Sequence, residues 1–308
     1  VLAVLLDTLA GLYPDDTDAR KRLLRETRVT ADDWAMPNFH VVPIVGENGQ
    51  LERRRLREGD SGNLYEFLDW MLSASSNGAA SMVIQQVILL EQFGHAYRGT
   101  TEEARAFLKA SSPGQLGRLW LTAMERALKS AGFDTSRFRQ GSPFTATAKK
   151  FVSGTNSVGN TSDLVKLLNL IEAGHLVDEW SSREAKRLLY MTARRIRYAS
   201  HPVLNNAAVY FKSGSLYSCQ PEPDFVCRQY MGNRVNRLAS IAIVESPAGE
   251  PALRYLVAVM SNVLRVNSAV AHQTLALRVH RLLEAAHELA PTSRPEPVAP
   301  IDAIKLAE

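Results

Sequence analysis

The sequence predicts an α/β protein of the α+β type, in which an antiparallel sheet flanked by helices joins a helical lobe. Apolar residues recur with helical spacing through most of residues 1–200, whereas after Pro202 the pattern becomes that of strands rich in Val, Ile and Tyr. A long helical pattern returns from about Asn267. We therefore expect a helical lobe over residues 1–200, an antiparallel sheet with a C-terminal helix over residues 201–290, and a proline-rich tail over residues 291–308.

The first elements are a buried helix and a hairpin. Residues 1–12 are apolar nearly all round, as in a helix that lies inside a domain. Two extended stretches, residues 41–45 and 50–55, flank Asn48-Gly49. That pair supplies the positive φ angles of a tight turn, so the two stretches are expected to form a hairpin.

Two helices with a short break between them follow the hairpin. Asn63 and Glu66 have the spacing of a capping box and predict a helix that runs to about Ser73. Residues 75–78, Ser-Ser-Asn-Gly, interrupt the helical pattern, and the next helix is expected to begin directly after them.

The second half of the helical lobe has clear start and stop signals. Ser112-Pro113 predicts a helix start, and Gly132 predicts its end. The polar stretch of residues 141–159 is expected to be a surface loop. Two further starts are predicted, the first capped by Thr161 and Ser162 and the second boxed by Ser181 and Glu184.

Three strands and one long helix complete the pattern. Residues 207–218, 238–245 and 253–260 have strand composition, and the turn at residues 247–250 joins the last two. They are expected to form three adjacent antiparallel strands. The helix that follows is predicted over residues 267–290.

Composition excludes several classes of protein. The chain has 308 residues, of which 45% are hydrophobic, so it is neither disordered nor fibrous. Its 36 basic and 32 acidic residues are scattered and give a net charge of only +4, which does not indicate a nucleic-acid partner. No run of roughly 20 apolar residues predicts a transmembrane segment in this chain. The seven histidines show no metal-ligand spacing, so neither a metal nor a cofactor is expected.

The two cysteines, Cys219 and Cys227, are eight positions apart. In an exported protein this pair would form a disulfide, and in a cytosolic protein it would remain two inert thiols. The spacing alone leaves both possibilities open.

Two short motifs have the composition of a functional site. Lys212-Ser213-Gly214 places a cation, a hydroxyl and a residue without a side chain along one predicted strand, which suits the binding of an anion. An ordinary edge strand with a solvated lysine fits the same triplet. Ser75-Ser76-Asn77 lies at the break between two helices, where these residue types also serve as helix terminators and N-caps.

The order of these motifs resembles that of the penicillin-recognising serine hydrolases, which are the class A beta-lactamases and the penicillin-binding proteins. In that family a Ser-x-Asn lies between two helices, a Lys-Ser/Thr-Gly opens a three-stranded meander, and a C-terminal helix follows. The resemblance is carried by residues 63–80, by residues 160–174, and by residue 211 through the C-terminal helix. It covers nearly the whole chain and is strongest over residues 61–90 and 155–290.

Two elements of the family pattern are absent from the 308 residues: the Ser-x-x-Lys that holds the nucleophile, and the Glu-x-x-Leu-Asn that supplies the deacylating glutamate in class A enzymes. Residues 1–6 look like the continuation of the family's central helix, which Ser-x-x-Lys opens. The chain is therefore expected to begin inside that helix, truncated just beyond the motif. The competing interpretation is a pseudoenzyme without a nucleophile.

The resemblance implies acyl-enzyme chemistry on a beta-lactam, a D-Ala-D-Ala type peptide or a small ester. It implies that Ser75 passes a proton to the leaving nitrogen and that Lys212 supports this proton transfer and attracts the substrate carboxylate. The alternative is a catalytically silent binding or scaffold protein of the same fold. By the same resemblance the protein is expected to be secreted or periplasmic, to act as a monomer and to need no cofactor.

The resemblance also assigns substrate-binding roles. Asn77 would orient the acyl side chain, Ser213 would bind the substrate carboxylate beside Gly214, and the backbone N–H of Ser215 would be one oxyanion donor.

Six other charged residues are interpreted as structural. A surface position is expected for three glutamates, and a place at the end of a helix for three arginines: Glu102, Glu103 and Glu125, and Arg194, Arg195 and Arg197.

Overall fold

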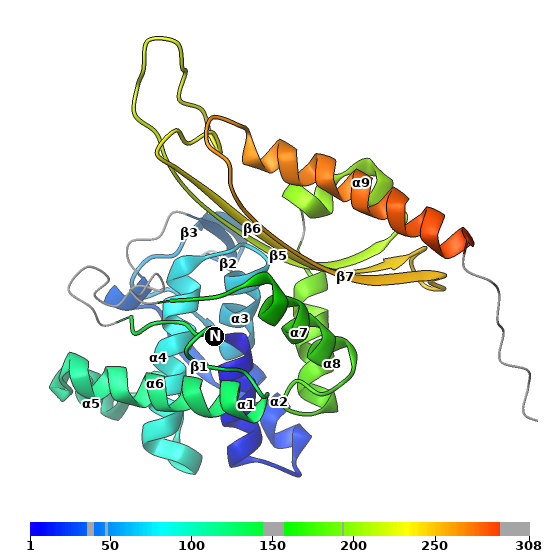
Figure 1. Ribbon diagram of the computed structural model, residues 1–308. Coiled ribbons are helices and arrows are strands. Elements are labelled where there is room, and N and C mark those ends of the chain that lie inside the picture. Colours follow the sequence, from blue (N-terminus) through cyan, green and yellow to red (C-terminus); the bar gives the residue numbers. More distant parts are fainter. Residues whose placement is uncertain (36–39, 47–48, 144–156, 193, 290–308) are drawn as a thin grey trace, which may run out of the picture.

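The computed structural model describes residues 1–35, 40–46, 49–143, 157–192 and 194–289. A three-stranded antiparallel sheet has one long helix and two short 3-10 turns on one face, and the other α-helices lie on the opposite side (Figure 1). The helices, in chain order, are α1 (Leu2–Leu12), α2 (Thr17–Glu26), α3 (Leu64–Leu72), α4 (Asn77–Phe93), α5 (Glu102–Ala110), α6 (Pro113–Ser130), α7 (Thr161–Glu172), α8 (Glu179–Tyr190) and α9 (Ser268–Leu289).

The strands of the described residues form three separate sheets. The main sheet has the order β5-β6-β7, with β5 (Ala208–Ser218), β6 (Val235–Ser246) and β7 (Leu253–Asn262). Two small antiparallel pairs accompany the helices. They are β1 (Arg28–Thr30) with β4 (Ser61–Asn63), and β2 (Val41–Val45) with β3 (Leu51–Arg55). The predicted hairpin at residues 41–55 and the predicted meander are thus both present.

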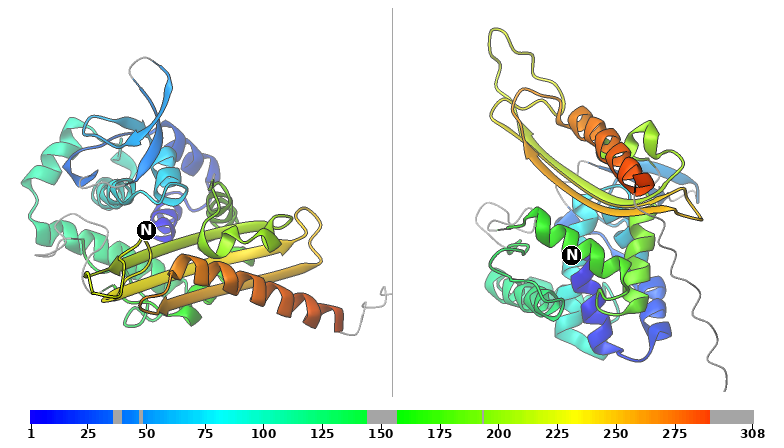
Figure 2. Two further views of the ribbon diagram at one scale, coloured as in Figure 1. Left: turned by 90° about the horizontal axis from the view of Figure 1, so that it is seen from above. Right: turned by 45° about the vertical axis from the view of Figure 1, so that its right-hand side comes forward.

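Strand β6 is apolar on consecutive residues because both of its faces are covered. Ile243 points into a cluster with Leu168 of α7 and Leu189 of α8. Its neighbour Val244 points to the other face, where it packs in a cluster that includes Ala276 of α9. The sheet is therefore held between helices on both sides, as Figure 2 also shows.

The helical region is built around α4. Every residue of α4 from Gly78 to Leu90 is buried, including the polar Ser81, Gln85 and Gln86. Helix α1 packs beside it through Leu5 and Leu9. The start of α1 lies between the helical region and the sheet in both views (Figures 1 and 2).

The structure agrees with most of the predicted helix ends and corrects two. The capping box of α3 is present, since Asn63 Oδ1 accepts from the Glu66 amide at 2.8 Å and Glu66 Oε2 accepts from the Asn63 amide at 2.6 Å. Helix α7, however, is capped by Asn160, and α8 is capped by Asp178. The predicted caps Thr161 and Ser162, and the predicted Ser181 box, lie inside these helices because an Asx side chain one to three positions earlier already satisfies the first amides.

Helix α2 was not among the predicted elements. Only Arg20 and Leu24 are buried in it, so its apolar pattern is weak. The Arg20 guanidinium, 1% exposed, donates to the carbonyls of Tyr13 at 2.7 Å and Pro14 at 2.6 Å and pairs with Asp178. A charged side chain therefore occupies a core position here.

Cys219 and Cys227 are joined in a disulfide. No helix within the described residues has the length and apolar character needed to cross a membrane. Most of the loop predicted over residues 141–159, and the tail predicted over residues 291–308, lie outside the described residues.

Candidate active site

The junction between α3 and α4 holds Ser75 in an unusual backbone conformation. The Ser76 amide donates to the carbonyl of Trp70 at 3.0 Å, and Ser75 lies between them with φ of 54°. This is the left-handed region that usually takes glycine at a helix end. The capping role belongs to the next residue, since Ser76 Oγ accepts from the Ala79 amide at 3.2 Å. The Ser75 hydroxyl is thus not used to cap α4.

Lys212 of β5 reaches across to this junction. Its Nζ donates to Ser75 Oγ at 2.7 Å and to the carbonyl oxygen of Ser213 at 2.7 Å. The structure therefore brings together two residues that lie 137 positions apart in the chain. Because Ser75 Oγ accepts this bond, its own proton remains free for donation to another group.

The environment of Lys212 disfavours its charged form. Burial, and after it the nearby charge of Arg197, lower the pKa of Lys212 from its ordinary 10.5 to about 8. An ammonium group that titrates this close to neutral pH can both attract an anion and exchange a proton.

Arg197 is the residue of this site that sequence reasoning missed. It opens a short 3-10 turn, Arg197–Ser200, with φ of 55°. Its two terminal nitrogens donate to Ser213 Oγ at 2.8 Å and to Ser215 Oγ at 2.9 Å. No local motif marks it, because its role depends on a strand that lies further along the chain.

The helix-end interpretation of the three arginines is wrong. Helix α8 ends at Tyr190, before all of them. Arg195 donates to the carbonyls of Leu204 at 2.7 Å and Ala207 at 2.8 Å and so supports the approach to β5. Arg197 stands at the site itself.

The site holds two cations and, among the described acidic residues, no carboxylate oxygen lies within 4 Å of the Lys212 or Arg197 side-chain nitrogens. Two serine hydroxyls on β5, together with the charges of Lys212 and Arg197, are a favourable set of partners for a ligand carboxylate. Gly214 lies between the two serines, and a Cβ added to it would meet nothing within 4 Å. The strand is therefore open to a ligand at this point.

The other predicted site residues lie nearby in the fold. Asn77 is the first residue of α4, two positions after Ser75, and it is exposed. Ser213 is buried and Ser215 is exposed. A groove of about 600 Å³ begins at Gly214 and Ser215 and continues over β6 and β7 to Met260 and Asn262.

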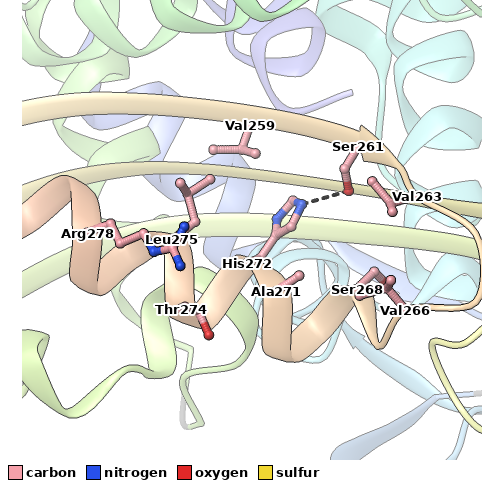
Figure 3. Close-up of a pocket in the computed structure, with 10 residues that line it drawn as sticks. All are labelled: Val259, Ser261, Val263, Val266, Ser268, Ala271, His272, Thr274, Leu275 and Arg278. Atoms are coloured by element: carbon pink, nitrogen blue, oxygen red, sulfur yellow. Dashed lines mark hydrogen bonds between the residues drawn. The ribbon is translucent and has the colours of Figure 1, made fainter.

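A second cavity, of about 370 Å³, lies between β7 and α9 (Figure 3). It contains His272, whose Nδ1 is 3.0 Å from Ser240 Oγ and whose Nε2 is 2.9 Å from Ser261 Oγ. Burial, and after it the charge of Arg197, lower the pKa of His272 to about 4. With both ring nitrogens bonded to hydroxyls, His272 is a neutral core residue. Within the described ranges no group of three or more His, Cys, Asp or Glu is placed to hold a metal.

The three glutamates lie on the outside of the helical region, as expected. Glu102 pairs with Arg105 at 3.4 Å in α5, and Glu125 pairs with Lys129 at 3.2 Å in α6. Glu103 is exposed in the first turn of α5.

Comparison with known proteins gives one clear result. No protein-family model matches the chain, and no curated protein sequence matches it. Solved structures do. The TLA-3 extended-spectrum beta-lactamase aligns over 93% of this chain and 82% of its own, with a TM-score of 0.54 and 11% identity. A class A beta-lactamase from Bacteroides cellulosilyticus DSM 14838 aligns over the same shares, with a TM-score of 0.54 and 13% identity.

PBP-A aligns over 92% of this chain and 80% of its own, with a TM-score of 0.51 and 15% identity. A variant of PBP-A is among the matches as an acyl-enzyme complex with penicillin G. The chain has the beta-lactamase fold. The predicted resemblance is thereby confirmed at the level of the fold. In this beta-lactamase fold Ser75 and Lys212 meet between the helical region and strand β5, and Arg197 bonds to the two serines that follow Lys212 on that strand.

Proposed function

We propose that this chain carries the proton-relay and carboxylate-binding part of a serine acyl-transfer site. The observation that supports it most directly is the 2.7 Å contact between Lys212 Nζ and Ser75 Oγ. In the proposal the Ser75 hydroxyl passes its proton to the leaving nitrogen of the substrate, and Lys212 supplies the charge that supports this transfer. Substrates would be a beta-lactam, a D-Ala-D-Ala type peptide or a small ester.

The proposal assigns the substrate carboxylate to Arg197, Ser213 and Ser215. The carboxylate would replace part of the bonding between the guanidinium and the two hydroxyls, and its charge would offset the two cations. Asn77, exposed at the start of α4, would bind the acyl side chain. The backbone N–H of Ser215 would donate to the developing oxyanion.

The acylated serine is assigned by the same proposal to a Ser-x-x-Lys that precedes α1. No such motif occurs in the 308 residues, and α1 starts between the helical region and the sheet, where the site lies (Figures 1 and 2). The 308 residues contain no Glu-x-x-Leu-Asn, so the sequence names no base for a deacylating water. The proposal therefore favours a long-lived acyl-enzyme over a fast class A beta-lactamase.

Export to the periplasm or the cell exterior is part of the proposal. The disulfide between Cys219 and Cys227 supports it, because such bonds persist in oxidising compartments.

Labelling with a fluorescent penicillin tests the proposal. The product of the complete reading frame should be labelled on one serine of a Ser-x-x-Lys, and residues 1–308 alone should not be labelled. Peptide mass mapping that finds the label on a serine within residues 1–308 would overturn the placement of the nucleophile. A complete protein that binds penicillin reversibly, without a label, would favour the alternative of a catalytically silent binding module.

Substitutions at the relay test the roles directly. Ser75→Ala and Lys212→Ala should each lower the second-order acylation rate by roughly 10² to 10⁴ fold, which is typical for the loss of a positioned proton-transfer or electrostatic group. The double variant should be little slower than either single variant, because residues that act as one unit are not additive. Full activity in Lys212→Ala would contradict the proposal.

A further inference from the structure

We infer that Tyr230 is a positioning residue for Arg197, and that the disulfide-closed arm of residues 219–230 thereby sets how well the site discriminates a ligand carboxylate. This inference rests on the proposed function. It concerns Tyr230 and the disulfide, neither of which belongs to the proposed proton relay or to the carboxylate-binding serines.

The contact between the two side chains is a stacked one. The guanidinium carbon of Arg197 lies 5.1 Å from the centroid of the Tyr230 ring. The terminal nitrogens of Arg197 are bonded to the hydroxyls of Ser213 and Ser215, and its buried Nε has no hydrogen-bond partner. The two serine hydroxyls can rotate to follow the guanidinium, so their hydrogen bonds do not fix its plane. The ring face of Tyr230 is therefore the contact that fixes the guanidinium plane.

Tyr230 is itself held on several sides. Its backbone has φ of 63°, and its carbonyl accepts from the Ser268 amide at 3.0 Å and from Ser268 Oγ at 3.2 Å at the start of α9. The Tyr217 ring packs edge-on against it, with the centroids 5.8 Å apart and the planes at 66°. The ring that contacts Arg197 is therefore anchored to β5 and to α9.

The disulfide closes the arm between these anchors. Cys219 follows directly after the last residue of β5, and Cys227 lies three positions before Tyr230. A second link joins the base of the arm, since Gln220 and Asn233 exchange hydrogen bonds of 2.9 Å and 2.7 Å. Reduction would leave the base intact and release the segment that leads into Tyr230.

A fixed guanidinium favours binding because a carboxylate can accept from both terminal nitrogens only when both are correctly oriented. If the ring were absent, the guanidinium would lose its attraction to the ring face, and its plane would have to be ordered each time a carboxylate binds. This ordering of the guanidinium weakens the binding only of ligands that have the carboxylate. A ligand without the negative charge should bind equally well with or without Tyr230.

The experiment uses benzylpenicillin and its methyl ester, in which one added methyl group removes the carboxylate charge. Dissociation constants are measured by isothermal titration on the complete protein, and second-order acylation rates replace them where capture is covalent. The acid-to-ester preference of the wild type should fall by roughly 3- to 30-fold in Tyr230→Leu, the range of a partly desolvated cation–π contact. Tyr230→Phe should restore it, because the ring face is kept.

Two comparisons separate positioning from general disruption. Phe225→Leu alters the same arm at a ring that stacks on Arg265 and does not contact Arg197, so it should keep the wild-type preference. Cys219→Ser with Cys227→Ser, or treatment with a reductant, should lower the preference in the same direction as Tyr230→Leu. Affinity for the ester should stay constant throughout.

The outcomes distinguish this inference from the proposed function. A wild-type protein that binds neither ligand, or binds acid and ester equally, contradicts the proposed function itself. A wild type with a clear preference for the acid that Tyr230→Leu leaves unchanged overturns the inference alone. An equal loss of acid and ester affinity in Tyr230→Leu also overturns it, since that result indicates a merely structural role.

Discussion

Lys212 and Arg197 bond to the same residue from two sides, with Lys212 Nζ 2.7 Å from the carbonyl oxygen of Ser213 and Arg197 Nη1 2.8 Å from its hydroxyl. Two positive charges are thus joined through one serine. Their mutual repulsion contributes to the lowered pKa of Lys212. An anion bound between them would relieve this repulsion and would raise the same pKa.

Binding of a carboxylate ligand should weaken as the pH rises through about 8. Lys212 has a pKa of about 8 in the folded protein, and only its ammonium form attracts the carboxylate. We expect the affinity for benzylpenicillin to fall by roughly tenfold between pH 6.5 and 9.5, as a charge-assisted contact is lost. Isothermal titration across this range provides the measurement. Lys212→Met should bind weakly at every pH, and a flat profile in the wild type would contradict the prediction.

Ser75→Gly should separate the stability of the α3–α4 junction from its chemistry. A non-glycine residue in the left-handed region costs about 1 kcal/mol, and Ser75 has φ of 54°. The variant should therefore be as stable as the wild type or more stable by up to about 1 kcal/mol, while it loses the proton relay. Urea denaturation and acylation rates together check this.

Ser76→Ala is the matched control for that experiment. It removes the N-cap of α4 and should cost about 1 kcal/mol while it leaves the Ser75 hydroxyl in place. A Ser75→Gly protein that is clearly less stable than the wild type would show that the backbone conformation is not strained.

Gly214 in β5 and Gly232 just before β6 should respond differently to alanine. A Cβ at Gly232 would lie 1.8 Å from the carbonyl oxygen of Val235, so Gly232→Ala should lower the free energy of unfolding by more than about 2 kcal/mol. A Cβ at Gly214 would meet nothing. Gly214→Ala should change stability by less than about 0.5 kcal/mol and should weaken ligand binding, because the methyl group enters the space beside the carboxylate site. Unchanged affinity in Gly214→Ala would show that the space beside Gly214 is not part of the ligand site.

The stability of the protein should fall as the pH is lowered from about 6.5 to about 4. The pKa of the His272 imidazole is about 6.5 in the unfolded chain, whereas burial lowers it to about 4 in the folded protein. The unfolded state therefore binds more protons across this window, and acid favours unfolding by up to roughly 3 kcal/mol from this group. Comparing the pH dependence of urea midpoints in the wild type and His272→Gln isolates the contribution. Parallel curves would show that His272 is not responsible.

The thiol content of the protein should be zero. Cys219 and Cys227 are the chain's two cysteines, and their Cα atoms are 5.8 Å apart in the bonded pair. Thiol counting under denaturing conditions without reductant, on protein recovered from its native compartment, should find none. Two free thiols would contradict both the bond and the proposed export.

Elements whose signals are local could be predicted from the sequence. The capping box of Asn63 and Glu66 lies within four residues, and the structure contains it. The sequence places the caps of α7 and α8 too late because Asn160 and Asp178 compete with the hydroxyl residues that follow them. The first amides of each helix donate to the earlier of the two suitable side chains. The sequence does not predict helix α2, because a buried arginine interrupts its apolar pattern.

The site could be predicted only in part. Ser75 and Lys212 were singled out because a family resemblance links motifs that are far apart, and the structure places them in contact. Arg197 could not be predicted in that way. No neighbouring residue in the sequence indicates that a 3-10 turn brings its side chain to Ser213 of β5. Spacing and composition describe neighbours along a helix or strand, whereas this residue acts through packing.

The separation of Ser75 and Lys212 along the chain also has a consequence for synthesis. When Ser75 leaves the ribosome, 137 further residues must be added before its partner exists, which takes about 7 to 27 s at ordinary elongation rates. During that time the α3–α4 turn can form from its own residues, but the pair cannot. Capture of a ligand by nascent chains should therefore appear only after β5 has emerged, so ligand binding reports late events in folding on the ribosome.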